Sequence, residues 1–250
     1  MNCSHACARF SLSLALLAAV AAHAEAPKAD GGARVVPDAA VAQPAAAREP
    51  GKQTSVDMAS LLSAFAGMPG LEATFSEEKH IALLARPLVS RGTLFFTRPA
   101  LLLRRVESPE PSEVVINKDA LRVRDKSGEQ TLDLRARKDI RPFVESLTWI
   151  LAGERAALER TYAASFQAES KGAPWQLSLK PKVAPLSHLI AELVIRGRGL
   201  FVEQIEVRET GGDKTITRIL SANPRRVFSA AERAKLFGER APDGGARSAP

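Results

Sequence analysis

The sequence predicts a strand-rich α+β domain built on one curled antiparallel sheet or barrel. Three observations lead to this fold class. About ten short segments alternate apolar and polar residues, as strands with one buried face do. Turn residues join these segments at short intervals, as at 117–119 and 126–128, which favours antiparallel pairing of neighbours. Amphipathic helical segments interrupt the series and can cover the concave face of such a sheet.

Three segments carry the periodicity of a helix. Apolar residues recur at helical spacing over 58–66, with Ser55 or Asp57 as the N-cap. The same spacing recurs over 140–151. A short helix capped by Ser229 closes the domain. The remaining patterned segments are predicted to be strands.

The stretch GTLFFTRPALLLRR, residues 92–105, places a charge between two apolar runs. In a strand, Leu94, Phe96 and Arg98 lie on one face, so the charge shares a side with two large apolar residues. Pro99 fixes its own φ, lacks an N–H group and biases the preceding residue towards extended backbone. We therefore expect the strand to end or bend there and Arg98 to be directed inward.

The N-terminus has the pattern of a Sec-type secretory signal peptide, predicted to span residues 1–24 with cleavage after Ala24. Arg9 precedes an apolar run that is too short to span a bilayer. Both cysteines, Cys3 and Cys7, lie in this segment, so we expect a mature chain without disulfides, located in the periplasm.

Composition divides the rest of the chain into three parts. Residues 25–54 are rich in Ala and Pro and are predicted to form a disordered arm, and residues 239–250 a disordered tail. Residues 55–238 form the predicted folded domain. Removal of Arg9 with the signal leaves 34 basic against 28 acidic residues, a net charge of +6. For an exported chain, anionic lipid or a membrane surface is a better counterpart for this charge than nucleic acid.

The predicted mature chain offers no recognisable catalytic constellation. His80 and His188 are its two histidines, and neither belongs to a hydrolase, zinc-protease or phosphate-binding motif. Glu78 and His80 could share a strand face and hold a metal, although a water-exposed strand end accounts for them more simply. We therefore expect a non-enzymatic protein without a cofactor.

Several stretches, taken in order, resemble the periplasmic outer-membrane lipoprotein carrier proteins, the LolA-like family. They are ATFSEEKH, SRGTLFFTRPALLLRR, ESPEP, VVINKDALRV and WQLSLKPK, within residues 56–238. The most specific element is G-x-L-x-F-x-R-P. The resemblance implies a half-open antiparallel β-barrel lidded by short helices, with an apolar cavity for acyl chains.

The resemblance also implies roles for particular residues. It makes Arg98, before Pro99, the gate that holds the lid closed through hydrogen bonds and releases it when lipid enters. Cavity positions are implied for Leu94, Phe96 and Leu102. An apolar stripe that packs or lines the cavity completes the candidate lipid-binding set, with Phe65, Phe75, Leu147 and Ile150. A simpler role for Arg98 is to extend into water from the strand end, its methylenes covering Phe96.

These features favour a monomeric periplasmic carrier that takes acyl chains from an inner-membrane exporter towards an outer-membrane acceptor, with only peripheral membrane contact. Departures from the family pattern, at Arg104 and in NKDALRV, keep open a carrier of a non-lipoprotein glycolipid or other amphiphile. A second class of function is a module with a filled core that docks an envelope protein through a basic face. A periplasmic hydrolase comes last.

Overall fold

The structure, a computed structural model, describes residues 57–138, 140–170 and 172–238. The predicted signal peptide, arm and tail lie outside the described residues, as do positions 55 and 56 of the predicted domain. Their assignments remain predictions. None of the helices in the described part of the chain is long and apolar enough to cross a membrane.

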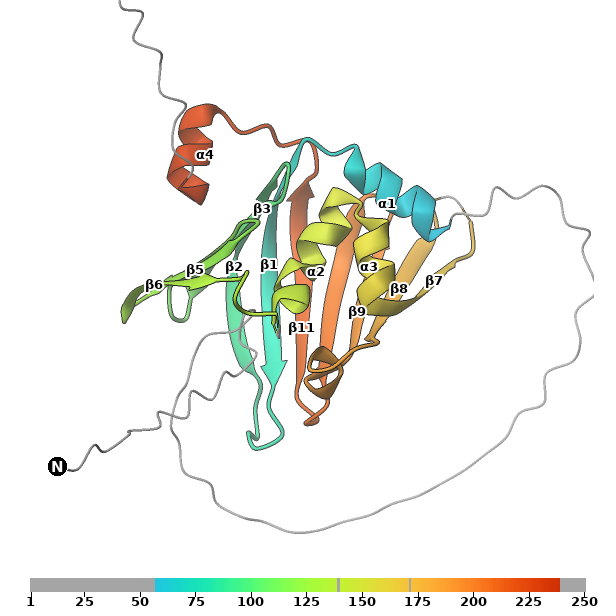
Figure 1. The fold of residues 1–250 in the computed structure, drawn as a ribbon, viewed down its shortest axis with the longest axis horizontal. Helices are drawn as coiled ribbons and strands as arrows, with labels where there is room; N and C mark the ends of the chain where they lie inside the picture. The colour runs from blue at the N-terminus through green and yellow to red at the C-terminus, as the bar shows by residue number, and fades with distance from the viewer. Residues whose placement is uncertain (1–56, 139, 171, 239–250) are drawn as a thin grey trace, which may run out of the picture.

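One antiparallel sheet of eleven strands forms the body of the domain, in the order β6-β5-β4-β3-β2-β1-β11-β10-β9-β8-β7. Every neighbour in this order is also a neighbour in sequence except β1 and β11, which pair at the centre. The sheet is not closed, and the β4–β6 end turns away from the other strands (Figure 1). The strands are β1 Gly70–His80, β2 Leu88–Thr97, β3 Leu101–Ser108, β4 Ser112–Ile116, β5 Ala120–Asp125, β6 Gly128–Asp133, β7 Tyr162–Ala168, β8 Pro174–Pro181, β9 Ile190–Arg198, β10 Phe201–Glu209 and β11 Lys214–Asn223. The predicted curled-sheet α+β fold is confirmed.

Four α-helices accompany the sheet: α1 Met58–Ala66, α2 Arg141–Ala152, α3 Arg155–Thr161 and α4 Ala230–Phe237. The Asp57 carboxylate accepts the Ser60 N–H at 2.8 Å and so caps α1. Gly153 ends α2 at φ 77°, a conformation that glycine adopts without strain. Ser229 and Glu232 form a reciprocal capping box at the start of α4. The three predicted helices are therefore present, with side-chain caps at the starts of α1 and α4 and a glycine cap at the end of α2.

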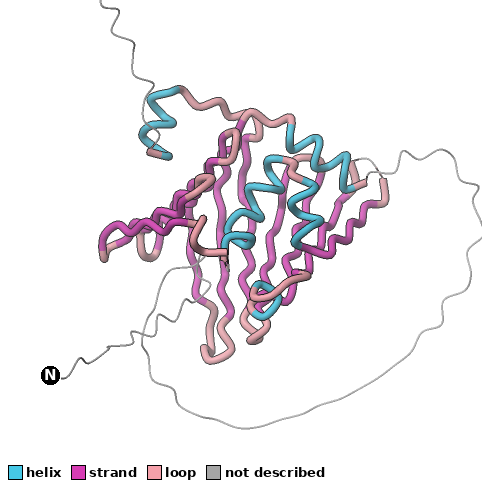
Figure 2. Tube along the Cα trace, viewed as in Figure 1, coloured by secondary structure: helices cyan, strands magenta, loops and turns pink. Residues whose placement is uncertain are grey.

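The helices divide between the two sides of the sheet (Figure 2). Helices α1, α2 and α3 lie together on one side, which we call the concave face, and their apolar residues join those of the strands in one large buried cluster. Helix α4 lies against the opposite, convex face, where Phe237 packs with Phe228, Phe95 and Leu103. Both faces are consequently buried over residues 92–97 of β2 and 101–104 of β3.

Gly92 opens the G-x-L-x-F-x-R-P stretch for a steric reason. The pairing of β2 with β3 shifts register between Arg91 and Gly92. A Cβ at this position would lie 1.9 Å from the Arg105 carbonyl oxygen and 3.0 Å from the Phe75 ring. Only glycine allows the two strands and the Phe75 side chain to approach this closely.

Two elements differ from the sequence prediction. Helix α3 was not among the predicted helices, and the strand that follows it, β7, begins only at Tyr162. The 3₁₀ turn η1, Leu186–His188, occupies the place where a strand was expected to begin, and β9 starts at Ile190. Seven-residue and three-residue helices carry too few repeats to show helical periodicity.

Candidate functional site

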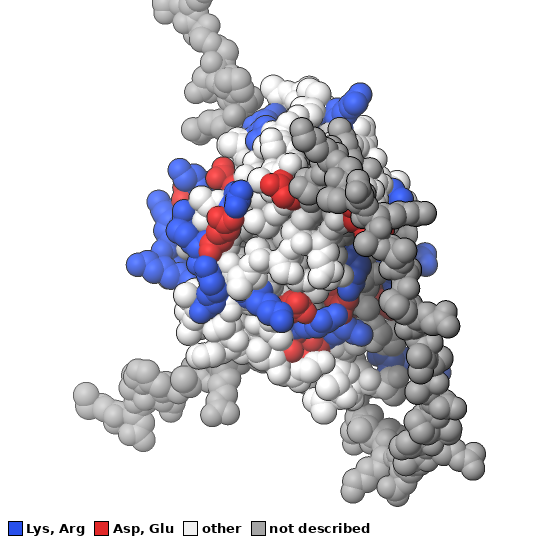
Figure 3. Space-filling model, turned by 90° about the vertical axis from the view of Figure 1, so that its right-hand side faces the viewer, with Lys and Arg blue, Asp and Glu red and all other residues white. Residues whose placement is uncertain are grey.

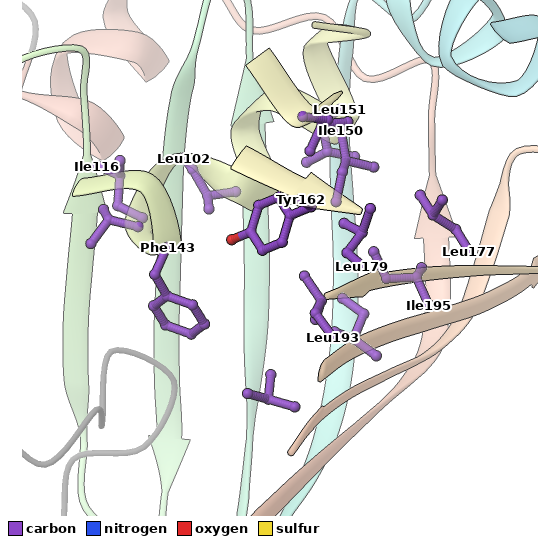
Figure 4. Packing of buried hydrophobic residues seen from close by; sticks show 14 of the residues in the cluster. Leu102, Ile116, Phe143, Ile150, Leu151, Tyr162, Leu177, Leu179, Leu193 and Ile195 are labelled. Atoms are coloured by element: carbon purple, nitrogen blue, oxygen red, sulfur yellow. The ribbon is translucent and has the colours of Figure 1, made fainter. Parts of the chain in front are cut away.

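Helix α2 does not fill the concave face completely, and a cavity of ≈ 50 Å³ remains beneath it. Side chains of β2, β3 and β4 line one side and those of β9 and β10 the other. Figure 4 shows Leu102 and Ile116 on one side and Leu193 and Ile195 on the other. The lining is apolar except for two residues, Arg104 and Ser146. The lining residues are Leu94, Leu102, Arg104, Val114, Ile116, Phe143, Val144, Ser146, Leu147, Leu193, Ile195, Ile205 and Val207.

A second cavity of ≈ 30 Å³ lies towards α1. Phe65 and Met68 form its helix side, and Leu71 and Val202 belong to its strand side. The two cavities share four lining residues, Leu94, Leu102, Leu147 and Ile205. The two therefore form a continuous apolar region under the helices, separated only by side chains.

Arg98 lies at the α1 edge of this region, just beyond the end of β2. Its Nε donates to the Met68 carbonyl at 2.9 Å, and its Nη2 donates to the carbonyls of Phe65, at 3.3 Å, and Ala66. These carbonyls belong to the last turn of α1 and the residues after it, which have no partner within the helix. The half-buried guanidinium thus joins the end of α1 to the β2–β3 turn.

The other side of the same turn is held by α4. Arg233 donates from Nη1 to the Thr97 hydroxyl at 3.0 Å and to the Arg98 carbonyl at 3.1 Å. Pro99 follows, exposed to solvent. The chain at the end of β2 therefore contacts α1 through the Arg98 side chain and α4 through the Thr97 hydroxyl and the Arg98 carbonyl.

A buried ion pair lies in the wall of the first cavity. Arg104 on β3 and Glu77 on β1 are 4% and 1% exposed. The Arg104 Nη2 donates to Glu77 Oε1 at 2.8 Å, and the Thr217 hydroxyl donates to Glu77 Oε2 at 2.8 Å. The Phe75 ring lies under the guanidinium, 4.8 Å from centroid to Cζ. Partners from β1 and β11 thus hold the guanidinium in place.

Burial dominates the electrostatics of this pair. Removal from water raises the pKa of the Glu77 carboxyl, and the nearby Arg104 and Thr217 offset this in part. Burial likewise lowers the pKa of Arg104, which Glu77 opposes. Arg104 Nε is enclosed and has no hydrogen-bond acceptor among the described residues. The pair therefore satisfies the carboxylate but leaves the enclosed Nε of Arg104 without an acceptor.

The Tyr162 hydroxyl anchors the middle of α2. It forms a hydrogen bond with the Ser146 hydroxyl, and its side chain is fully buried among core residues (Figure 4). Burial raises the pKa of Tyr162 to about 12. The contact joins the lid helix to the first residue of β7, an edge strand of the sheet.

The structure separates the candidate lipid-binding residues into three groups. Leu94, Leu102, Leu147 and Phe65 line the cavities. Phe75, Phe96 and Ile150 are buried in the core but do not belong to the lining. Arg98 and Pro99 lie at the edge, with Arg98 bonded to α1. The role of each in lipid binding stays a prediction.

Sequence reasoning missed much of the lining. Ile205 and Val207 alternate with polar neighbours, whereas Val114, Ile116 and Ile195 lie in apolar runs. Both patterns predict a strand without showing which face encloses a cavity. Arg104 was noted only as a departure from the family pattern. The spacing of Leu102 and Arg104 on one strand face was the signal that could have identified it.

The histidines lie away from the cavity. The Glu78 carboxylate accepts from Arg218 Nη1 at 2.6 Å and lies 3.4 Å from His80 Nε2. Among the described residues there is no group of three or more His, Cys, Asp and Glu side chains that could hold a metal ion. His188 lies in η1, and its carbonyl accepts from the Thr210 hydroxyl at 2.7 Å.

Comparison with protein families gives a match over residues 50–236 to a family described as outer membrane lipoprotein carrier protein LolA-like. The chain belongs to this family. In the described part of the chain, the match spans all eleven strands and every helix except the last residue of α4. LolA-like carrier families are generally non-enzymatic, and their members are periplasmic. A search of curated proteins found no matching relative.

Solved structures show a distant resemblance to the LolA-like chain. A LolA superfamily protein from Nitrosomonas europaea has 10% identity and a TM-score of 0.41, covering 71% of this chain and 97% of its own. A DUF1329 family protein from Desulfovibrio piger has 10% identity and a TM-score of 0.43, covering 72% and 96%. The MucA/MucB complex of Pseudomonas aeruginosa has 12% identity and a TM-score of 0.39, covering 67% of this chain and 57% of its own. The family assignment rests on the sequence match.

Proposed function

We propose that this protein is a periplasmic carrier that binds the acyl chains of a lipoprotein or another lipid beneath α1 and α2 and shuttles them from the inner towards the outer membrane. The observation that carries the proposal is Arg98, whose guanidinium holds the end of α1 beside a continuous apolar region. An inner-membrane exporter and an outer-membrane acceptor are the partners this role requires.

The size of the cavities makes movement of the lid part of the proposal. One water molecule needs about 10–15 Å³ by the same measure of volume. The ≈ 50 and ≈ 30 Å³ cavities therefore hold only a small part of an acyl chain while the lid is closed. An incoming chain must displace α1, α2 or both from the sheet.

Arg98 makes such a displacement reversible. Burial of a chain of about fifteen methylenes contributes on the order of 12 kcal/mol before ordering costs, which by itself would prevent release. Hydrogen bonds to a charged group contribute about 1.5–3 kcal/mol each, and Arg98 makes three with the end of α1. Lipid that opens the lid breaks these bonds, so the closed, empty state competes with the loaded state.

A transfer assay with a fluorescent acyl lipid tests this proposal. Arg98→Leu is expected to retain lipid more strongly and to deliver less of it to acceptor vesicles than the parent protein. Arg91→Leu is the matched control, because it removes the same charge from an exposed position of the same strand. Equal retention by the parent and the Arg98 variant would remove the gate from the proposal.

A protein-docking module with a filled core is the second candidate, favoured by the small volume of the closed cavities. Its predicted basic face is less uniform than the net charge suggests. Figure 3 shows acidic side chains lying among the Lys and Arg residues of one face. Arg208, for example, is ion-paired with Glu192 at 2.7 Å and Glu206 at 2.8 Å.

Native mass spectrometry of protein purified gently from the periplasm separates the two candidates. A co-purified lipid or lipoprotein would support the carrier and identify its cargo class. A mass without any adduct, together with no uptake of a fluorescent fatty acid, would favour the docking module.

A further inference from the structure

The wall of the first cavity contains a charged group that the gating of the lid does not use. Arg104 lines the cavity, and its guanidinium can only donate hydrogen bonds. Its Nε is enclosed and has no acceptor within the described part of the chain. Buried polar groups are almost always hydrogen-bonded in folded proteins. Arg104 Nε is therefore a donor beside an apolar cavity for which the described residues supply no acceptor.

The surroundings of Arg104 place this donor rigidly. Glu77 accepts from Nη2 at 2.8 Å, Thr217 holds the other Glu77 oxygen, and the Phe75 ring lies under the guanidinium. These partners come from β1 and β11, the two strands that pair at the centre of the sheet. The guanidinium therefore keeps its position whether or not the helices move.

We propose that the cavity takes a single-chain amphiphile whose anionic head group, a carboxylate or phosphate, enters and accepts a hydrogen bond from Arg104 Nε. The apolar chain then extends along the shared lining residues Leu94, Leu102 and Leu147 towards Phe65 and α1. The inference rests on the proposed carrier function and narrows its cargo. Acyl chains alone would leave the Arg104 Nε without an acceptor.

The guanidinium donor favours an anionic acceptor over a neutral one, and the charged side chains around it are balanced. Lys79 lies on the same face of β1 as Glu77, two residues further on, and is 8% exposed. With Arg104 it supplies two positive charges against the one negative charge of Glu77. Glu209, half-buried close to Lys79, balances them, and burial raises the pKa of its carboxyl. Hydrogen bonds between a guanidinium and an anionic oxygen are shorter and stronger than those to a neutral hydroxyl.

The test compares three ligands with the same chain: dodecanoate, dodecyl phosphate and dodecanol. Each is titrated into the purified protein against a neutral fluorescent probe, N-phenyl-1-naphthylamine. The variants are Arg104→Met and the double variant Arg104→Met/Glu77→Gln, which avoids leaving a buried carboxylate unpaired. Arg105→Met is the matched control, since Arg105 is the next residue of β3 and pairs with Glu113 on the convex face.

The parent protein is expected to bind at least one of the two anionic ligands about tenfold more tightly than dodecanol, and the double variant to lose this preference. The Arg105 control should keep it. The anion that shows the larger preference identifies the source as a fatty acid or a phosphate lipid. If the parent binds all three ligands equally, the carrier function stands and the head-group site is excluded.

Two further outcomes would also overturn the inference. If the double variant loses affinity for dodecanol as much as for the anions, Arg104 supports the fold of the cavity and does not bind a head group. If the parent binds neither the probe nor any ligand, the proposed carrier function fails with it. The failure of the head-group site and that of the carrier are thus distinguishable.

Discussion

Arg98 lies at the α1 edge of the apolar region, which we call its rim, and Arg104 lies in its wall. The two arginines differ in what holds them. Arg98 donates to carbonyls at the end of a helix, and Arg104 donates to a carboxylate on the central strand of the sheet. A helix end can move away and expose its carbonyls to water at little cost. Glu77 cannot leave Arg104 without disruption of the sheet. The rim is therefore suited to a reversible contact and the wall to a permanent one.

The largest expected effect is on the wall. Arg104→Met leaves Glu77 buried without its charged partner, so we expect the free energy of unfolding to fall by about 3–5 kcal/mol. Urea titration followed by tryptophan fluorescence measures this. Arg105→Met, which removes a half-exposed pair on the other face, is expected to cost less than about 1 kcal/mol. Equal losses in the two variants would show that burial does not distinguish the pairs.

At the rim, Arg98→Leu is expected to cost about 1–3 kcal/mol, because water can replace the lost donors once the end of α1 moves. The effect should be local, so the amides of α1 should exchange with solvent faster while those of the central strands do not. Hydrogen exchange resolved by peptide measures both. Unchanged exchange in α1 would show that the three hydrogen bonds do not hold the helix closed.

The wall should also impose a pH dependence that the rim lacks. The pKa of Glu77 is higher in the folded protein than the ordinary 4.5, so folding favours the protonated carboxyl. The protonated carboxyl therefore contributes stability below pH 4.5, and this contribution is lost as the pH rises through the pKa of the folded state. The loss is about 1.4 kcal/mol for each unit by which the folded pKa exceeds the unfolded pKa. Glu77→Gln should remove this slope from the pH profile of the urea midpoint. A slope of the same size in the variant would assign it to another group.

The smallest effect is expected at Tyr162, which anchors α2 to the sheet edge as Arg98 anchors α1. Tyr162→Phe removes one hydrogen bond and should cost about 1 kcal/mol. The chain has one tyrosine, so absorbance at alkaline pH reports this hydroxyl alone, with an expected pKa of about 12. Because the unfolded state ionises nearer pH 10, stability should fall as pH rises above that value. Ionisation near pH 10 in the folded protein would indicate that the lid admits water.

The helices show what the sequence can predict about this fold. Helices α1, α2 and α4 each have several turns of apolar periodicity or a side-chain cap, such as Asp57 or Ser229, and all three were predicted. Helix α3 has neither: it spans seven residues, and its N-cap Glu154 makes no side-chain capping bond. It forms because Ala157 and Leu158 are buried against the rest of the protein, which is tertiary information.

The charged residues show where sequence reasoning ends. Alternation places Glu77 and Lys79 on one strand face, but the stretch SEEKH was interpreted as a water-exposed strand end. The structure instead buries both side chains while Glu78 and His80 remain partly exposed. Arg104 directly follows three leucines at 101–103. This run is apolar on both faces because α4 covers one face and the lid helices cover the other, so the pattern did not show which face Arg104 shares. Burial on both faces removes the period of two that identifies an inner face.

The contact between Arg233 and the β2–β3 turn gives the convex face a link to the lid. Arg98 holds α1 through its side chain while its own carbonyl, with the Thr97 hydroxyl, accepts from Arg233 of α4. A displacement of the turn that releases α1 also changes the hydrogen bonds between the turn and Arg233, and with them the contact of α4 with the convex face. Binding of lipid in the apolar region can thereby be coupled to the position of α4 on the convex face. An acceptor that binds near α4 would then distinguish loaded from empty protein without contacting the cargo.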